Sequence, residues 1–149
     1  MKGRKRFLLV DTQGWVIETV VLPAGTPERI GAAILFERAK RRLAAAKLQL
    51  VWADGGFAGQ EWQAQMQEQF GWQVEIVAKL EGQQGFVVLP RRWPVERTFG
   101  WWGHYRRLSK DYEGDPASSR AWLLWAMVDK MLCRLFPKTD YPPFRYRSV

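Results

Sequence analysis

Cysteine and histidine are almost absent from this 149-residue chain, which contains one of each, Cys133 and His104. A tetrahedral zinc site takes about four such ligands, so a single chain cannot build one. One cysteine also excludes a disulfide within the chain, which fits a reducing cytoplasm. We expect Cys133 to be a small, buried hydrophobic residue.

Long apolar runs are missing as well. The basic N-terminal stretch MKGRKRFLLVD has an apolar run too short for a signal peptide. No segment approaches the roughly 20 apolar residues of a membrane span, so no membrane partner is expected. Hydrophobic residues nevertheless make up 47% of the chain, which indicates a globular domain with one core.

Acidic residues are outnumbered, with 15 Asp and Glu against 23 Lys and Arg, a net charge of +8. Such an excess points to an anionic partner, most often a nucleic acid. The alternative is a basic surface that only keeps the protein soluble.

Apolar periodicity predicts the order strand, strand, helix, strand, helix, strand, helix, helix. A hairpin followed by βα units indicates an α/β domain with a mixed sheet over residues 1–136. A basic, proline-rich tail over 137–149 follows it. The expected strands are 6–11, 15–22, 48–54 and 74–80, with an extended stretch at 86–90, and the expected helices are 28–47, 60–70, 94–108 and 118–136.

The helical periodicity also selects core residues. The expected buried face of the last helix contains Ala121, Leu124, Trp125, Val128, Leu132 and Leu135. We further expect Trp52, Trp62 and Trp122 in the core, and Val95, Phe99 and Trp102 on the apolar face of helix 94–108.

Two carboxylates stand out from this pattern. Asp54 ends a strand and precedes Gly55, where it is either a turn residue or a functional residue at the carboxyl end of a strand. Glu96 lies near the start of a helix, where the helix dipole favours it. Gly100 and Gly103 share its helical face with Arg107, and leave room for a bulky ligand or for close helix packing.

Paired carboxylates among cationic side chains suit metal-assisted phosphoryl transfer. Mg²⁺ prefers oxygen ligands, and Arg and Lys hold the DNA backbone. We therefore expect Mg²⁺ or Mn²⁺ at Asp54 and Glu96. For Trp93 there are two alternatives: its side chain stacks on a DNA base, or it anchors its helix in the core. The expected DNA-binding residues are Arg91, Arg92, Trp93, Arg97, Arg106, Arg107 and Lys110.

Three segments carry a family resemblance. VWADGGFAG (51–59) and GFVVLPRRWPVERTFGWWGHYRRLSKDYE (85–113) resemble bacterial insertion-sequence transposases of the DDE type. GRKRFLLVDTQGWVIETVV (3–21) is similar to the segment that precedes them. The resemblance implies a ribonuclease-H-like fold, an Asp-Asp-Glu triad with Mg²⁺, and action on double-stranded DNA in the bacterial cytoplasm, at the nucleoid. It also allows a homodimer or an assembly with full-length transposase.

The resemblance assigns roles by position. Asp54 matches the second acid, Glu96 the third, and Arg92 the basic residue of the C-terminal signature. Two positions depart from that signature: Leu89 replaces its tyrosine and Gly103 replaces its lysine. DNA contacts by those two side chains are therefore not expected.

Two interpretations of the first acid stay open. In the first, it lies on a central strand upstream of the GRKR segment, and Asp11 is a turn residue of DTQG. The chain would then be marginally stable, or would pair strand 6–11 directly with strand 48–54. In the second, Asp11 is the first acid. We favour the first, because turn chemistry alone explains Asp11.

Three functions follow from these features. The chain is the catalytic part of a transposase, which nicks DNA at transposon ends and transfers the freed 3′ end. It is alternatively an inactive, DNA-binding transposase fragment that inhibits the full-length enzyme or has no function. The third hypothesis is a basic nucleic-acid-binding structural protein whose carboxylates only support the fold.

Overall fold

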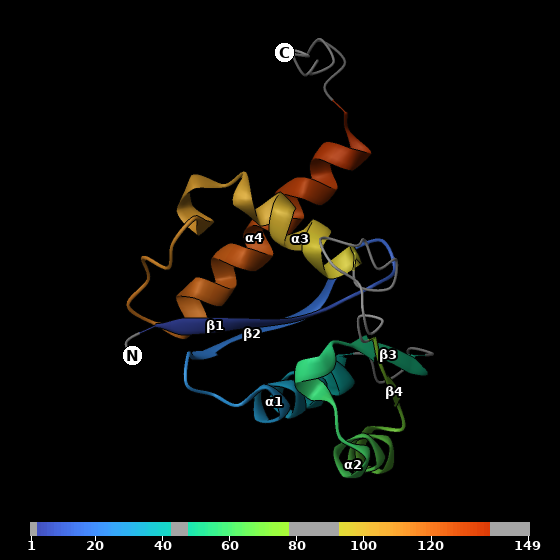
Figure 1. Ribbon diagram of the computed structural model, residues 1–149. Coiled ribbons are helices and arrows are strands. Elements are labelled where there is room, and N and C mark those ends of the chain that lie inside the picture. Colours follow the sequence, from blue (N-terminus) through green and yellow to red (C-terminus); the bar gives the residue numbers. More distant parts are fainter. Residues whose placement is uncertain (1–2, 43–47, 78–92, 138–149) are drawn as a thin grey trace, which may run out of the picture.

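A computed structural model describes residues 3–42, 48–77 and 93–137. The described elements follow the predicted order, a mixed α/β arrangement with two small sheets and four helices (Figure 1). The expected stretch 86–90 and the tail beyond Pro137 lie outside the described residues. The strands are β1 (Arg4–Val10), β2 (Val16–Pro23), β3 (Leu50–Ala53) and β4 (Gln73–Ile76), and the helices are α1 (Glu28–Arg42), α2 (Gln60–Phe70), α3 (Trp93–Gly103) and α4 (Pro116–Leu135).

The predicted hairpin is confirmed, because β1 pairs antiparallel with β2. Its turn is closed by Asp11, whose Oδ1 accepts hydrogen bonds from the backbone N–H groups of Gln13 (2.8 Å) and Trp15 (2.9 Å). Strand β3 pairs in parallel with β4 in a second sheet. The predicted alternative, direct pairing of residues 6–11 with 48–54, is wrong for the described residues, because β1 and β3 belong to different sheets.

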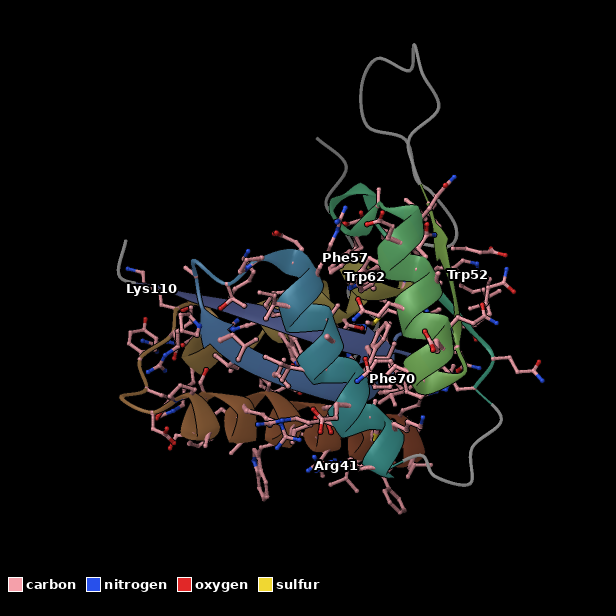
Figure 2. The ribbon with its side chains drawn as sticks, turned by 90° about the horizontal axis from the view of Figure 1, so that it is seen from below. Arg41, Trp52, Phe57, Trp62, Phe70 and Lys110 are labelled. Carbon is pink, nitrogen blue, oxygen red and sulfur yellow. The ribbon has the colours of Figure 1, made fainter. Side chains whose placement is uncertain are left out.

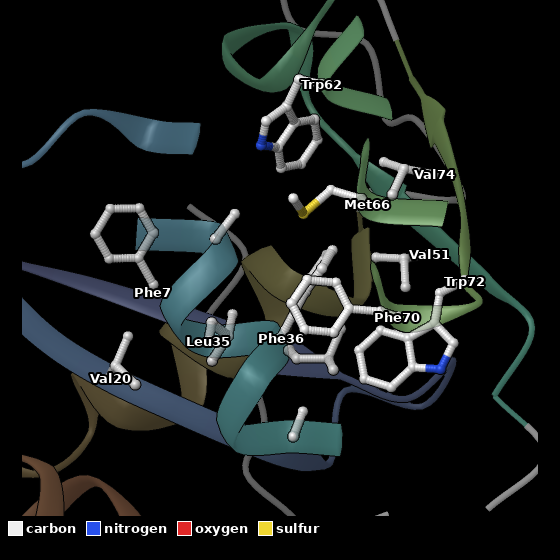
Figure 3. Close-up of a cluster of buried hydrophobic side chains, with 13 residues drawn as sticks. Phe7, Val20, Leu35, Phe36, Val51, Trp62, Met66, Phe70, Trp72 and Val74 are labelled. Carbon is white, nitrogen blue, oxygen red and sulfur yellow. The ribbon is translucent and has the colours of Figure 1, made fainter. Parts of the chain in front are cut away.

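The hairpin is buried on both faces. Phe7, Leu9 and Val20 pack into one core with α1, α2 and the β3–β4 sheet (Figure 3). Val21, on the opposite face of β2, packs into a second core with Trp102 of α3 and Leu123 of α4. Strand β2 therefore lies between α1 on one side and α4 on the other (Figure 1).

The expected core of α4 is wrong. Leu123, Ala126 and Met127 are buried, whereas Trp125 is 68% exposed and Leu135 71% exposed. The helix is apolar on two opposite faces, and periodicity selected the outward one. Also exposed are Ala121, Trp122, Val128, Leu132 and Cys133, and Leu124 is half-buried.

Helix α3 is shorter than predicted. It ends at Gly103, and a separate 3-10 turn follows at Arg106–Leu108. Two glycines within four residues weaken its last turn. Trp102 is buried as expected, but Phe99 is 41% exposed, which contradicts the predicted apolar face at that position.

Candidate active site

The candidate acid Asp54 lies directly after β3. Its Oδ1 accepts a hydrogen bond from the backbone N–H of Gly56 at 3.0 Å, which caps a 3-10 turn over Gly55–Phe57. The second carboxylate oxygen takes no part in this cap. Asp54 is therefore both a turn residue and an exposed carboxylate at the carboxyl end of a strand.

The second candidate acid, Glu96, lies in the first turn of α3 and is exposed. No described atom lies within 4 Å of a side chain added at Gly100 or Gly103. The alternative that these glycines permit close helix packing is therefore wrong within the described residues. Among the described residues, the surface of α3 at Gly100 and Gly103 is uncovered.

The hairpin turn fixes the position of α3. Gly14 adopts φ +85°, and its carbonyl oxygen accepts a hydrogen bond from the hydroxyl of Thr98. The rings of Trp15 and Trp101 lie 4.9 Å apart, and Arg97 donates to the carbonyl of Gln13 at 3.3 Å. Because Asp11 belongs to the same turn, these contacts hold it close to the start of α3.

One cavity of about 500 Å³ brings the three candidate acids together. Asp11, Asp54 and Glu96 all line it, and apolar side chains from β1, β3 and α1 form most of the remaining wall. Asp11, Asp54 and Glu96 therefore border one cavity, and their grouping as a catalytic site stays a prediction.

The cavity follows the edges of two strands. It contacts the consecutive residues 5–12 along β1 and 50–54 along β3. Side chains alternate along a strand, so a cavity over one face of a sheet would contact every second residue. Contact with every residue means that the cavity runs along the backbone edge of each strand.

Hydrogen bonds identify the edges that face the cavity. Gln73 N–H bonds to the carbonyl of Gln49 and Val77 N–H to that of Ala53, so odd-numbered residues of β3 face β4. Alternation then directs the backbone of Leu50 toward the cavity. In β1, the carbonyl of Gly3 accepts a hydrogen bond from Ala24 N–H, so odd-numbered residues direct their backbone groups toward β2. The backbone N–H and C=O groups of Arg6 therefore point away from β2. Among the described residues, no strand lies between these two edges.

A second cavity, of about 420 Å³, continues the first along β1. Lys5, Arg6 and Phe99 line both cavities, and Lys110 lines the second. Lys110 lies at the opposite end of the molecule from Trp52 of β3 (Figure 2). Lys5 and Arg6 of β1 therefore border both the cavity that contains Asp54 and Glu96 and the cavity that contains Lys110.

Sequence reasoning missed these β1 cations, although the run GRKR at 3–6 was the available signal. Lys5 Nζ lies 2.9 Å from Glu28 Oε1, and this hydrogen bond lowers the pKa of the Glu28 carboxyl below its ordinary 4.5. Arg6 donates to the carbonyl of Leu108 at 3.1 Å.

The other predicted DNA contacts divide into three groups. Arg91 and Arg92 lie outside the described residues. Trp93 is 40% exposed at the start of α3, and Arg106 is exposed after its end. Arg107 bonds to Glu113 at 2.7 Å and stacks on Trp122 at 4.3 Å, so it does not extend the face of Glu96.

The donor set fits a divalent cation in part. Carboxylate oxygens are the ligands that Mg²⁺ and Mn²⁺ prefer, and two exposed carboxylates line one cavity. Within residues 3–42, 48–77 and 93–137, no three Asp, Glu, His or Cys side chains are placed to share one ion. Asp54 and Glu96 are therefore two oxygen donors beside one cavity, without a third grouped donor among the described residues.

The described helices include none that is both long and apolar enough to cross a membrane. Comparisons with curated proteins and with solved structures give no match. Residues 1–128 match the model of the transposase DDE domain. DDE transposases act on DNA and generally use a divalent metal, which agrees with the carboxylates and the basic strand. The chain therefore belongs to the transposase DDE domain family.

Proposed function

We propose that this chain is the catalytic portion of an insertion-sequence transposase, with a ribonuclease-H-like fold, that cleaves and joins DNA at transposon ends. The observation that carries the proposal is that Asp54 and Glu96 line one cavity beside a basic strand. Asp54 and Glu96 would hold Mg²⁺ or Mn²⁺. When bound, such a cation stabilises charge on the attacking and leaving oxygens of a phosphodiester.

The basic residues position the DNA in this proposal. From Lys5 to Asp11 the strand spans about 20 Å, or about six phosphates of one DNA strand. Arg6 and Lys110 neutralise phosphates along this path, and Trp93 stacks on a base near the transposon end. Arg97 orients α3 through Gln13 as well as adding positive charge.

We further propose that a β-strand carrying the first acid completes the site between β1 and β3. Two facing strand edges are matched by an extended strand, which bonds to both. The end of such a strand would lie beside Asp54 and Glu96. Asp11 then remains a turn residue, as its two backbone hydrogen bonds favour.

The alternative function is an inactive DNA-binding fragment, favoured by the absence of a third grouped acid among the described residues. A nicking assay separates the two, with supercoiled plasmid and an insertion-sequence end duplex as substrates and Mg²⁺ or Mn²⁺ as cofactor. We expect Asp54→Asn, which keeps the oxygen that caps Gly56, and Glu96→Gln to reduce nicking at least 100-fold without weakening DNA binding. Glu68→Gln on the exposed face of α2 is the matched control and should be neutral.

Asp11→Asn tests the competing triad in the same assay. The amide oxygen still accepts the two backbone hydrogen bonds of the turn, so only the charge is lost. Unchanged nicking assigns Asp11 to the turn, whereas a loss equal to that of Asp54→Asn assigns it to the triad. DNA binding with no metal-dependent nicking in any variant, even when a strand carrying the first acid is supplied, would favour the inactive fragment.

A further inference from the structure

Strand β1 begins with three cations that all line the second cavity, Arg4, Lys5 and Arg6. Two of them are each paired with a carboxylate. Arg4 Nη1 lies 3.2 Å from Asp111 Oδ2. Lys5 Nζ lies 2.9 Å from Glu28 Oε1. Arg6 donates to a backbone carbonyl and forms no ion pair within the part of the chain that the structure describes. The chain's own acids therefore neutralise two of the three cations.

Backbone carbonyls also hold both neutralised cations in place. Arg4 donates to the carbonyls of Glu113 at 2.8 Å and Gly114 at 2.6 Å. Lys5 donates to the carbonyl of Thr26 at 3.0 Å. A neutral carbonyl oxygen positions a cation without cancelling its charge, whereas a carboxylate cancels it. Removing the charge of either carboxylate would therefore leave a positioned cation beside a cavity.

The two carboxylates lie on opposite sides of β1. Side chains alternate along a strand, so Arg4 and Lys5 point to opposite faces. Asp111, which pairs with Arg4, belongs to the loop that precedes α4 and lines the second cavity. Glu28, which pairs with Lys5, lies in the first turn of α1 and lines the first cavity. Each acid thus borders the path proposed for DNA.

The ion pairs are accessible to a ligand. The side chains of Arg4 and Asp111 are 20% and 21% exposed. Those of Lys5 and Glu28 are 32% and 48% exposed. The hydrogen bond from Lys5 lowers the pKa of the Glu28 carboxyl, which is therefore ionised at neutral pH. Arg and Lys bind carboxylate and phosphate oxygens through the same N–H donors, so these acids and a DNA phosphate compete for the same atoms.

We propose that these two carboxylates keep Arg4 and Lys5 from contacting DNA phosphates, and so limit sequence-independent binding of DNA along β1. This limit rests on the proposed function, in which DNA follows the strand. Sequence-independent affinity comes from cation–phosphate contacts, so two neutralised cations remove two such contacts. Binding then depends more strongly on the base contacts that only the correct DNA makes.

Binding of a fluorescent duplex of about 20 base pairs and arbitrary sequence, in EDTA at about 50–200 mM salt, tests the proposal. Asp111→Asn and Glu28→Gln keep an acceptor oxygen and remove only the charge. We expect each to raise affinity at least about fivefold at the lowest salt. Each should also steepen the slope of log affinity against log salt by about 0.9, because one phosphate contact is added.

Glu37→Gln is the matched control. It removes the same charge and frees Arg41, a cation of α1 that lines neither cavity. It should change affinity less than about twofold and leave the slope unchanged, because it adds no phosphate contact on β1.

A second substitution locates the gain in affinity. Lys5→Gln added to Glu28→Gln should remove the increase, because the freed ammonium is then absent. Circular dichroism checks that each variant is folded, and this pair carries the test if Asp111→Asn does not fold.

Three results would overturn the proposal: gains no larger than that of Glu37→Gln, an unchanged slope, or a gain that persists without Lys5. Each of these leaves the proposed function intact, since DNA still binds. Failure of the chain and of every variant to bind the duplex would overturn both this proposal and the proposed DNA path. Because EDTA removes divalent metal, no outcome depends on catalysis.

Discussion

At the scale of single residues, Gly14 links the hairpin turn to the helix that carries Glu96. Its φ of +85° lies in a region that favours glycine, and an added Cβ would lie 3.0 Å from the carbonyl oxygen of Pro94. The turn and α3 therefore approach as closely as they do because no side chain separates them.

We expect Gly14→Ala to lower the free energy of unfolding by about 1–3 kcal/mol, through backbone strain and the contact with α3. Urea unfolding followed by tryptophan fluorescence measures this change. Gly25→Ala is the control, since no atom lies within 4 Å of a Cβ there, and it should change stability by less than about 0.5 kcal/mol. Equal effects of the two substitutions would contradict the role given to Gly14.

The sequence predicted individual site residues unevenly. Asp54 and Glu96 were found because each stands at an element boundary, where local pattern is informative. Arg107 was placed on the face of Glu96 because the helix was taken to continue past Gly103. Cys133 was taken as buried on residue type alone, which says nothing about which face of a helix is covered.

At the scale of elements, a buried charge cluster joins β2 to helices on both sides. Glu18 of β2 is 1% exposed, and its carboxylate contacts Arg120 of α4 at 2.6 Å and Arg42 of α1 at 3.1 Å. Neither helix periodicity nor strand alternation predicts a buried glutamate. The cluster depends on two arginines that lie far apart in the sequence.

Glu18→Gln should destabilise the chain by about 3 kcal/mol, because it leaves Arg120 partly buried without its counter-ion. Glu37→Gln is the matched control. It breaks the exposed pair with Arg41 within α1 and should cost less than about 0.5 kcal/mol. Thermal or urea unfolding measures the free energy of unfolding of the two variants. Equal losses of stability would show that the Glu18 cluster does not hold α1 and α4 to β2.

The wrong prediction of the buried face of α4 also arises at the scale of elements. Periodicity detects an apolar stripe but does not say which stripe faces the core when a helix has two. The distinction depends on Arg120, Lys130 and Arg134, whose partners on β2, α3 and the hairpin turn are fixed only by the tertiary arrangement.

At the scale of the whole molecule, the order of the described elements and the α/β class were predictable because each element carries its own local pattern. The gap between β1 and β3 was not, since a cavity between two strand edges depends on pairings distant in sequence. The family resemblance, with its central strand missing, gave direct pairing of the two strands as one of two expectations. The structure instead keeps them in separate sheets beside a cavity of about 500 Å³.

The central claim is that Asp54 and Glu96 hold one divalent ion in this cavity. Paramagnetic broadening of backbone amide NMR signals by Mn²⁺, titrated into the ¹⁵N-labelled chain, tests it most directly. We predict selective broadening at residues 54–56 and 95–97 that Asp54→Asn reduces at both sites and Glu68→Gln leaves unchanged. Broadening spread evenly over the exposed acids, or unaffected at 95–97 by Asp54→Asn, would contradict the claim.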